Sequence, residues 1–170
     1  MDTYYAALTR RSVRRYLRDD IPDEDLTKIL EAGRTAPSAA NRQPWRFVVV
    51  RDPKIREKVA AACNGQTWMA DAAVILAGIG VPGESQKWYA VDVTIAMQTM
   101  ILVASSLGYG TCWIGAFDED KVKEVLGIPK EMRVIALTPI GKPSETPQAR
   151  PRKDRSAVFF LDEFGKGFTI

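Results

Sequence analysis

The chain has 170 residues, a net charge of +3 and a hydrophobic fraction of 46%, which fits one domain whose core needs no metal or disulfide. This charge is too small to indicate nucleic-acid binding by itself. The absence of histidine excludes histidine-dependent nucleophiles, histidine general bases and histidine metal sites. Cys63 and Cys112 lie far apart and match no metal or redox motif, which favours a reduced, cytoplasmic setting.

Neither the N-terminus nor the long uncharged segment in the middle of the chain predicts a membrane segment. The N-terminus has no basic region followed by an apolar run, so no signal peptide is expected. The long uncharged segment between Asp92 and Asp118 is interrupted by amides, hydroxyls and two glycines. Its apolar part is too short to cross a bilayer, and we expect a buried core helix there.

A short helix is predicted over 2–9, and an arginine-rich run follows it over 10–18. If the middle of this run is extended, Arg10, Ser12 and Arg14 lie on one face at a period of two. Two guanidinium groups beside a hydroxyl suit a phosphate monoester. A solvated basic turn stays open as an alternative. A nucleic-acid patch is disfavoured because no second basic cluster or interleaved aromatic lies nearby.

A polar loop bounded by Pro37 and Pro44 comes next. The two prolines predict that the residues before them, Ala36 and Gln43, are extended rather than helical. The side chains between them that both donate and accept hydrogen bonds are Ser38, Asn41 and Gln43. Such a stiff, neutral, polar loop suits a planar polar ligand. It is equally consistent with a simple connection from a helix to a strand.

Hydrophobic periodicity predicts the remaining elements. Helices are expected over 23–34, 53–64, 89–107 and 118–126, and strands over 47–50, 73–79, 132–140 and, briefly, 111–115. The chain forms a single domain, 1–170, in which 142–170 is a C-terminal arm rich in proline at its start. The apolar patch 158–161 near its end predicts packing on a partner subunit, with packing on its own domain as the alternative.

Taken in order, these segments resemble the nitroreductase family of flavin-dependent oxidoreductases. The resemblance extends from Arg10 to about Val158 and is specific because five motifs occur in the same order. The motifs are RRSVRRY at 10–16, PSAANRQPW at 37–45, DVTIAM at 92–97, GYGTCWIGAF at 108–117 and GKP at 141–143.

The resemblance implies an α+β fold with a mainly antiparallel central sheet flanked by helices, in an intertwined homodimer with FMN at the subunit interface. The positions that match the family's FMN-binding residues are Arg10, Arg11, Ser12, Arg14, Pro37, Ser38, Asn41, Gln66, Trp113, Ile114, Gly115, Ala116 and Arg152. Among these, the loop with Pro37, Ser38 and Asn41 is expected to reach the flavin of the opposite subunit. Arg14 is expected to stabilise the reduced flavin.

The implied reaction is a ping-pong cycle in which NADH or NADPH reduces flavin N5 and a nitroaromatic, quinone or similar small molecule is then reduced. It needs no catalytic side chain, since the flavin carries the chemistry. Alternatives are flavin fragmentation, reductive dehalogenation and flavin binding without turnover. The short segment 81–89 argues against the specialised relatives. Trp88 and Tyr89 could stack on the ring there or simply pack.

Overall fold

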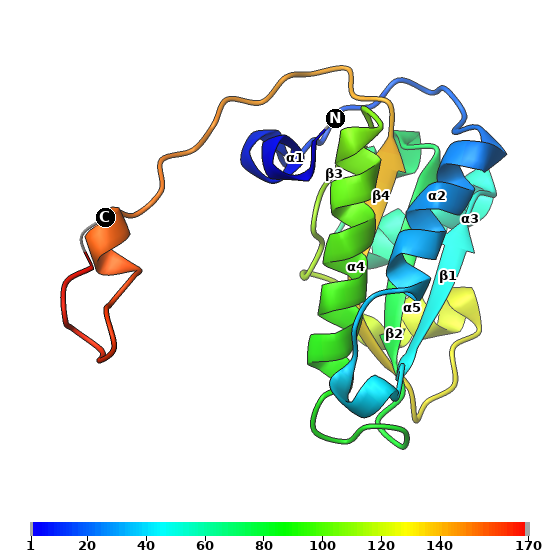
Figure 1. Ribbon diagram of the computed structural model, residues 1–170. Helices are drawn as coiled ribbons and strands as arrows, with labels where there is room; N and C mark the ends of the chain where they lie inside the picture. Colours follow the sequence, from blue (N-terminus) through cyan, green and yellow to red (C-terminus); the bar gives the residue numbers. More distant parts are fainter. Residues whose placement is uncertain (1, 169–170) are drawn as a thin grey trace.

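Four antiparallel strands form the centre of the computed structural model, which describes residues 2–168 (Figure 1). In spatial order the strands are β1, Trp45–Val50; β2, Val74–Gly80; β4, Arg133–Gly141; and β3, Gly110–Thr111. The α-helices are α1, Thr3–Thr9; α2, Asp23–Arg34; α3, Pro53–Ala62; α4, Tyr89–Ser106; and α5, Glu119–Leu126. Three short 3-10 helices are η1, Ala39–Asn41; η2, Thr67–Asp71; and η3, Arg155–Ala157.

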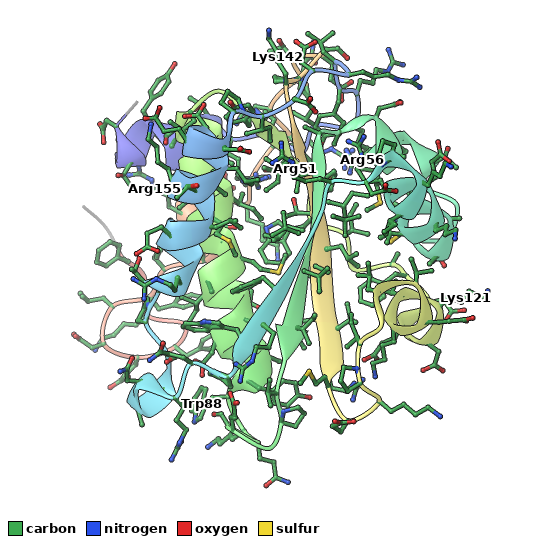
Figure 2. All side chains as sticks on the ribbon, turned by 90° about the vertical axis from the view of Figure 1, so that its right-hand side faces the viewer. Arg51, Arg56, Trp88, Lys121, Lys142 and Arg155 are labelled. Atoms are coloured by element: carbon green, nitrogen blue, oxygen red, sulfur yellow. The ribbon has the colours of Figure 1, made fainter. Side chains whose placement is uncertain are left out.

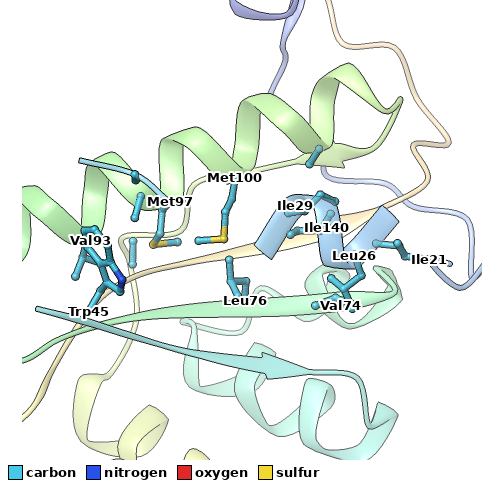
Figure 3. Close-up of a cluster of buried hydrophobic side chains, with 14 of the residues drawn as sticks. Ile21, Leu26, Ile29, Trp45, Val74, Leu76, Val93, Met97, Met100 and Ile140 are labelled. Atoms are coloured by element: carbon cyan, nitrogen blue, oxygen red, sulfur yellow. The ribbon is translucent and has the colours of Figure 1, made fainter. Parts of the chain in front are cut away.

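The sheet is covered on both faces, because α2 and α4 pack on one side and α3 and α5 on the other (Figures 1 and 2). Alternate residues of β2 therefore point into different cores. Val74 and Leu76 contact the α2–α4 side (Figure 3), while Ile75 and Ala77 contact the α3–α5 side. This double coverage explains why β2 is a continuous apolar run.

Helix α4 is long and apolar enough to cross a membrane by length and composition, yet it is a core helix of this domain. Met97 and Met100 are fully buried, and they lie over Gly78 of β2 and Gly33 of α2. A Cβ at Gly33 would come within 2.6 Å of the Met100 side chain. The two glycines thus let α4 approach both its neighbours closely.

The segment after α1 and the start of the C-terminal arm run side by side at one end of the molecule. The Leu17 N–H donates to the Lys142 carbonyl at 2.9 Å, and the Ser144 N–H donates to the Arg15 carbonyl at 3.0 Å. Beyond this ladder the arm leaves the body of the domain (Figure 1). Of its aromatic residues, Phe159, Phe164 and Phe168 are exposed, and Phe164 reaches 94%.

Most predicted elements are confirmed to within a few residues, and the expected α+β class with an antiparallel sheet is correct. The expectation for Gln43 is wrong in one respect. It is not helical, but neither is it extended, since its φ is 51°. Ala40 and Asn41 share this left-handed conformation, with φ of 51° and 54°. Hydrogen bonds inside the loop hold a geometry that a proline by itself does not favour.

Candidate functional site

The arginine-rich run and the C-terminal arm enclose a cavity of about 460 Å³, here called the arginine cavity. Its lining side chains come from both segments: Arg10, Arg11, Ser12, Arg14, Pro147, Gln148, Ala149, Arg150, Pro151 and Arg152. The structure therefore brings together five of the predicted site residues from opposite ends of the chain. Five guanidinium groups and a hydroxyl around one cavity form a receptor for an anion with several oxygens.

Backbone pairing fixes the wall of the arginine cavity that belongs to the run 10–14. Ser12 forms a parallel bridge with Thr111, and the Val13 N–H donates to the Thr111 carbonyl at 3.0 Å. The Arg14 N–H donates to the Glu145 carboxylate at 2.7 Å. This extended geometry confirms the predicted common face of Arg10, Ser12 and Arg14.

Two buried polar atoms on or beside the run 10–14 lack partners within residues 2–168. Arg10 lines the cavity, and its Nη1 is buried without a hydrogen bond. The hydroxyl of Thr111, whose backbone pairs with Ser12, is also buried without one. Arg11 differs, because its guanidinium donates to the carbonyls of Leu8 and Arg10 at 2.9 Å and so caps the end of α1. A buried donor without an acceptor costs free energy. An anion placed in the cavity would supply the missing acceptor for Arg10.

A second group of predicted residues lies along the segment after β3. The Trp113 indole donates to Gln98 of α4 at 3.1 Å, and Ile114 pairs with Leu137 of β4 through two backbone bonds. Ile114 is buried, whereas Gly115 and Ala116 expose their backbone. A Cβ at Gly115 would meet no atom within 4 Å, so nothing in this chain occupies the space beside it.

Gln66 lies next to this segment and connects it to the end of α3. Its side-chain amide donates to the carbonyls of Cys63 at 3.0 Å and Ala116 at 3.3 Å. Gln66 and Ala116, both predicted from the family pattern, are thus brought together in one chain. The carbonyl oxygen of the Gln66 amide is left to accept from a ligand.

The loop 37–44 lies apart from the arginine cavity, at the other end of α4 (Figure 1). The eighteen residues of α4 span about 27 Å at 1.5 Å per residue. Within the loop, Ser38 Oγ accepts the Gln43 N–H at 3.0 Å, and the Gln43 amide donates to Asn41 at 3.2 Å. One chain therefore does not bring Pro37, Ser38 and Asn41 to the other predicted residues.

Trp88 and Tyr89 begin α4 at the same end as this loop. Trp88 is 42% exposed, and the Lys87 ammonium lies 5.2 Å from the centre of its ring (Figure 2). Tyr89 is half-buried and covers Gly80 of β2. Tyr89 thus packs within the domain, while the Trp88 ring stays accessible.

The sequence singled out neither Arg150 nor Glu145 for the site, and it gave Thr111 no role beyond membership of the motif 108–117. Arg150 lines the arginine cavity beside Arg152, and its spacing of two on an extended arm was the available signal. Thr111 and Glu145 are placed by pairing between distant segments, for which the sequence contains no local signal. The buried hydroxyl and the carboxylate both belong to the cavity's supporting structure.

Two titratable groups behind the cavity remain neutral. Burial raises the pKa of the Cys112 thiol, although Arg14 opposes this shift. Burial also raises the pKa of Tyr16, whose hydroxyl donates to the Val13 carbonyl at 2.7 Å. Neither group offers a nucleophile or base at neutral pH. The charge of the cavity therefore comes from its arginines.

Comparison with known proteins finds the same family in sequence and in structure. The model of the nitroreductase family matches residues 7–73 and 63–142. A putative NADH dehydrogenase/NAD(P)H nitroreductase of Archaeoglobus fulgidus is 34% identical over 154 residues, covering 86% of this chain and 88% of the relative. An FMN reductase [NAD(P)H] of Bacillus subtilis is 31% identical, covering 87% of this chain and 68% of the relative.

A solved structure gives the same result. A nitroreductase family protein from Clostridium novyi superposes with a TM-score of 0.81 at 32% identity, over 99% of this chain and 97% of that one. The family match, the identity over most of the chain and the shared fold agree. The chain belongs to the nitroreductase family.

Proposed function

We propose that this protein is an FMN-dependent oxidoreductase that takes reducing equivalents from NADH or NADPH. The observation that carries the proposal is the arginine cavity with its unpartnered Arg10 donor, in a chain of this family. The B. subtilis relative is named an FMN reductase [NAD(P)H], which supports the same pairing of flavin and nicotinamide.

The residues of the arginine cavity fit the phosphate of FMN. A phosphate monoester carries close to two negative charges at neutral pH and three terminal acceptor oxygens. Arg10, Arg14 and Arg152 supply charge-assisted donors, and Ser12 supplies a hydroxyl. Binding would also remove the penalty for the unpartnered Arg10 Nη1. The fit therefore rests on charge and on hydrogen bonding together.

The segment 113–116 with Gln66 is the proposed wall along the flavin ring. Its exposed backbone at Gly115 and Ala116 offers N–H donors, and the space beside Gly115 is open. FMN, when bound, accepts a hydride from NAD(P)H and passes two electrons to the acceptor. The chain's own part is to bind, orient and set the charge around the ring, so no side-chain acid or base is assigned.

The proposed site is shared between two copies of the chain. The loop 37–44 and the arginine cavity lie at opposite ends of α4, so a flavin in contact with both needs a second subunit. Exposed apolar side chains on α1, α4 and the arm support a dimer; they are Tyr4, Tyr5, Leu8, Val91, Ile95, Val158, Phe159, Leu161 and Phe164. The arm 142–170 is proposed to pack on the partner.

The proposed acceptor is a nitroaromatic, a quinone or a similar planar molecule, and the proposed location is the cytoplasm. Only eight residues separate β2 from α4, which are 81–88, so no long segment covers the ring. The exposed Trp88 side chain offers a stacking surface at the end of α4 where the loop lies. Such a site selects by shape more than by specific hydrogen bonds.

Flavin retention and reduction test the proposal. The purified protein is expected to bind FMN with a yellow colour and to bind riboflavin more weakly, because riboflavin lacks the phosphate. Anaerobic NADH or NADPH should bleach the bound flavin, and an added quinone should restore the colour. Light scattering should give a dimer. Failure to retain FMN would overturn the proposal, whereas FMN binding without bleaching would leave only a flavin-binding protein.

A further inference from the structure

We infer that Asp92 is a positioning residue whose buried carboxylate holds residues 38–43 in the shape in which they meet the partner subunit's flavin. The inference rests on the proposed function, since it assumes that this loop contacts FMN. It goes beyond that function because Asp92 touches neither the arginine cavity nor the segment 113–116. It assigns a role to the Asp92 carboxylate, whose hydrogen bond goes to the loop and not to another helix or strand.

Asp92 is an unusual residue at this depth in the domain. It lies in the first turn of α4 and is only 2% exposed. One carboxylate oxygen, Oδ1, accepts the Ala39 N–H at 3.1 Å. The other, Oδ2, is buried and has no partner within residues 2–168. A buried carboxylate with only one hydrogen bond lowers the stability of the domain. A need for core packing therefore does not explain why an aspartate occupies this position.

The loop that Asp92 contacts is itself strained. Ala40, Asn41 and Gln43 all have φ between 51° and 54°, a region that L-residues with a Cβ adopt at a cost. The bonds from the Gln43 N–H to Ser38 Oγ and from the Gln43 side-chain amide to Asn41 stay inside the loop. They define its local shape but do not fix its position on the domain.

The bond from Ala39 to Asp92 supplies that missing attachment. In the part of the chain that the structure describes, one other hydrogen bond joins residues 38–43 to a helix or strand, from the Trp45 N–H to the Gln43 carbonyl at 2.8 Å, and it links residues only two positions apart. The bond to Asp92 is the one that ties these residues to α4. The next attachment is the Val81 N–H to the Pro44 carbonyl at 2.9 Å, beyond the strained residues. Without Asp92 the loop would lose its hydrogen bond to α4, and a ligand would have to supply more of its ordering on binding.

The primary test compares Asp92→Ala with Asp92→Asn. FMN titration should show affinity about tenfold weaker for Asp92→Ala, the factor expected when one hydrogen bond to a charged group is lost. Asp92→Asn should recover most of this affinity, because its amide oxygen can accept the same N–H. The near-ultraviolet and visible circular dichroism of bound flavin should follow the same order.

Glu119→Ala is the matched control. Glu119 is also a carboxylate that accepts a backbone N–H, from Val134 at 3.0 Å, but it lies on α5, on the opposite face of the sheet. Arg133 lowers its pKa to about 2, with help from Lys123. Its replacement should lower the thermal midpoint of the protein and leave FMN affinity unchanged.

A second pair of variants isolates the hydrogen bond. Ala39→Pro removes the donor, and Ser38 already has the extended backbone, φ −140° and ψ 157°, that a following proline requires. If Asp92 acts through this N–H, Asp92→Ala should change FMN affinity little in the Ala39→Pro background. Equal effects of Asp92→Ala in both backgrounds would overturn the inference.

The remaining outcomes separate this inference from the proposed function. Wild-type FMN affinity in Asp92→Ala, or an Asp92→Asn variant as weak as Asp92→Ala, would overturn the positioning role. A wild-type protein that binds no FMN would overturn the proposed function instead. If Asp92→Ala does not fold, Asp92→Asn and Ala39→Pro still decide, because one keeps the acceptor and the other lacks the donor.

Discussion

The arginine cavity and the loop 37–44, at the two ends of α4, differ in whether their polar groups have hydrogen-bond partners within the chain. In the cavity the chain leaves charge and donors without acceptors, as at Arg10 Nη1. In the loop the side chains and backbone bond to one another, and the cost is backbone strain. The first region needs a ligand to complete it, while the second is already shaped. Variants in the two regions should therefore differ in whether they change affinity or stability.

The largest expected effect is in the cavity. Arg10→Ala should weaken FMN binding by about tenfold to a hundredfold, the range for a lost hydrogen bond to a charged group. Riboflavin affinity should stay the same because riboflavin has no phosphate. The thermal midpoint of the apoprotein should not fall, since Nη1 has no partner to lose. Titration with both flavins and a melting curve measure this.

Arg51→Ala is the control for Arg10. Arg51 forms an exposed ion pair with Asp23 at 2.6 Å and lies outside the cavity, so its loss should leave both flavin affinities unchanged. If Arg10→Ala weakened riboflavin and FMN equally, Arg10 would not be a phosphate ligand. The arginine cavity would then not be a region that a bound phosphate completes, and it would not differ from the loop in this respect.

An intermediate effect is expected where the arm joins the cavity. Glu145→Ala removes the carboxylate that accepts the Arg14 N–H at 2.7 Å, so both walls of the cavity lose a fixed position. FMN affinity should fall by about threefold to tenfold, as for one modest hydrogen bond. Glu163→Ala, an exposed carboxylate farther along the arm, should leave affinity unchanged. Equal FMN affinity in both variants would mean that the backbone hydrogen bonds of Leu17 with Lys142 and of Ser144 with Arg15 hold the arm in place without Glu145.

The smallest effect is expected in the loop and has the opposite sign. Ala40→Gly should raise the stability of the apoprotein by about 0.5–1 kcal/mol, because glycine adopts the left-handed conformation without strain. Ala61→Gly, an exposed position within α3, should instead lower it by about 1 kcal/mol. Urea unfolding of both variants gives the comparison. A destabilised Ala40→Gly would show that residue 40 is not left-handed in solution.

The sequence was sufficient where local chemistry decides the structure. The helix over Asp23–Arg34 has apolar positions at helical spacing and acidic residues in its first turn, and its bounds were predicted to the residue. The extended face of Arg10, Ser12 and Arg14 follows from alternation and is confirmed by the bridge to Thr111. These features depend on neighbours a few residues away.

The sequence was insufficient where distant segments meet. Nothing near Arg14 indicates that Glu145 will accept its N–H, since the two are 131 positions apart. The left-handed Gln43 contradicts the usual effect of a following proline, and it depends on Ser38. Asp92 resembled an ordinary first-turn acid of a helix, and its contact with Ala39 required the fold. Tertiary hydrogen bonds decide all three.

The exposed arm has a consequence for handling the protein. Residues 150–155 hold four basic side chains on a backbone outside the core, so a trypsin-like protease would cleave there in any subunit whose arm is not packed on a partner. A nick after Arg152, Lys153 or Arg155 would separate the aromatic residues that are proposed to pack on the partner and complete the shared flavin site, yet leave the sheet and its four covering helices intact. A preparation could therefore lose its yellow colour while its melting curve still reported a folded protein.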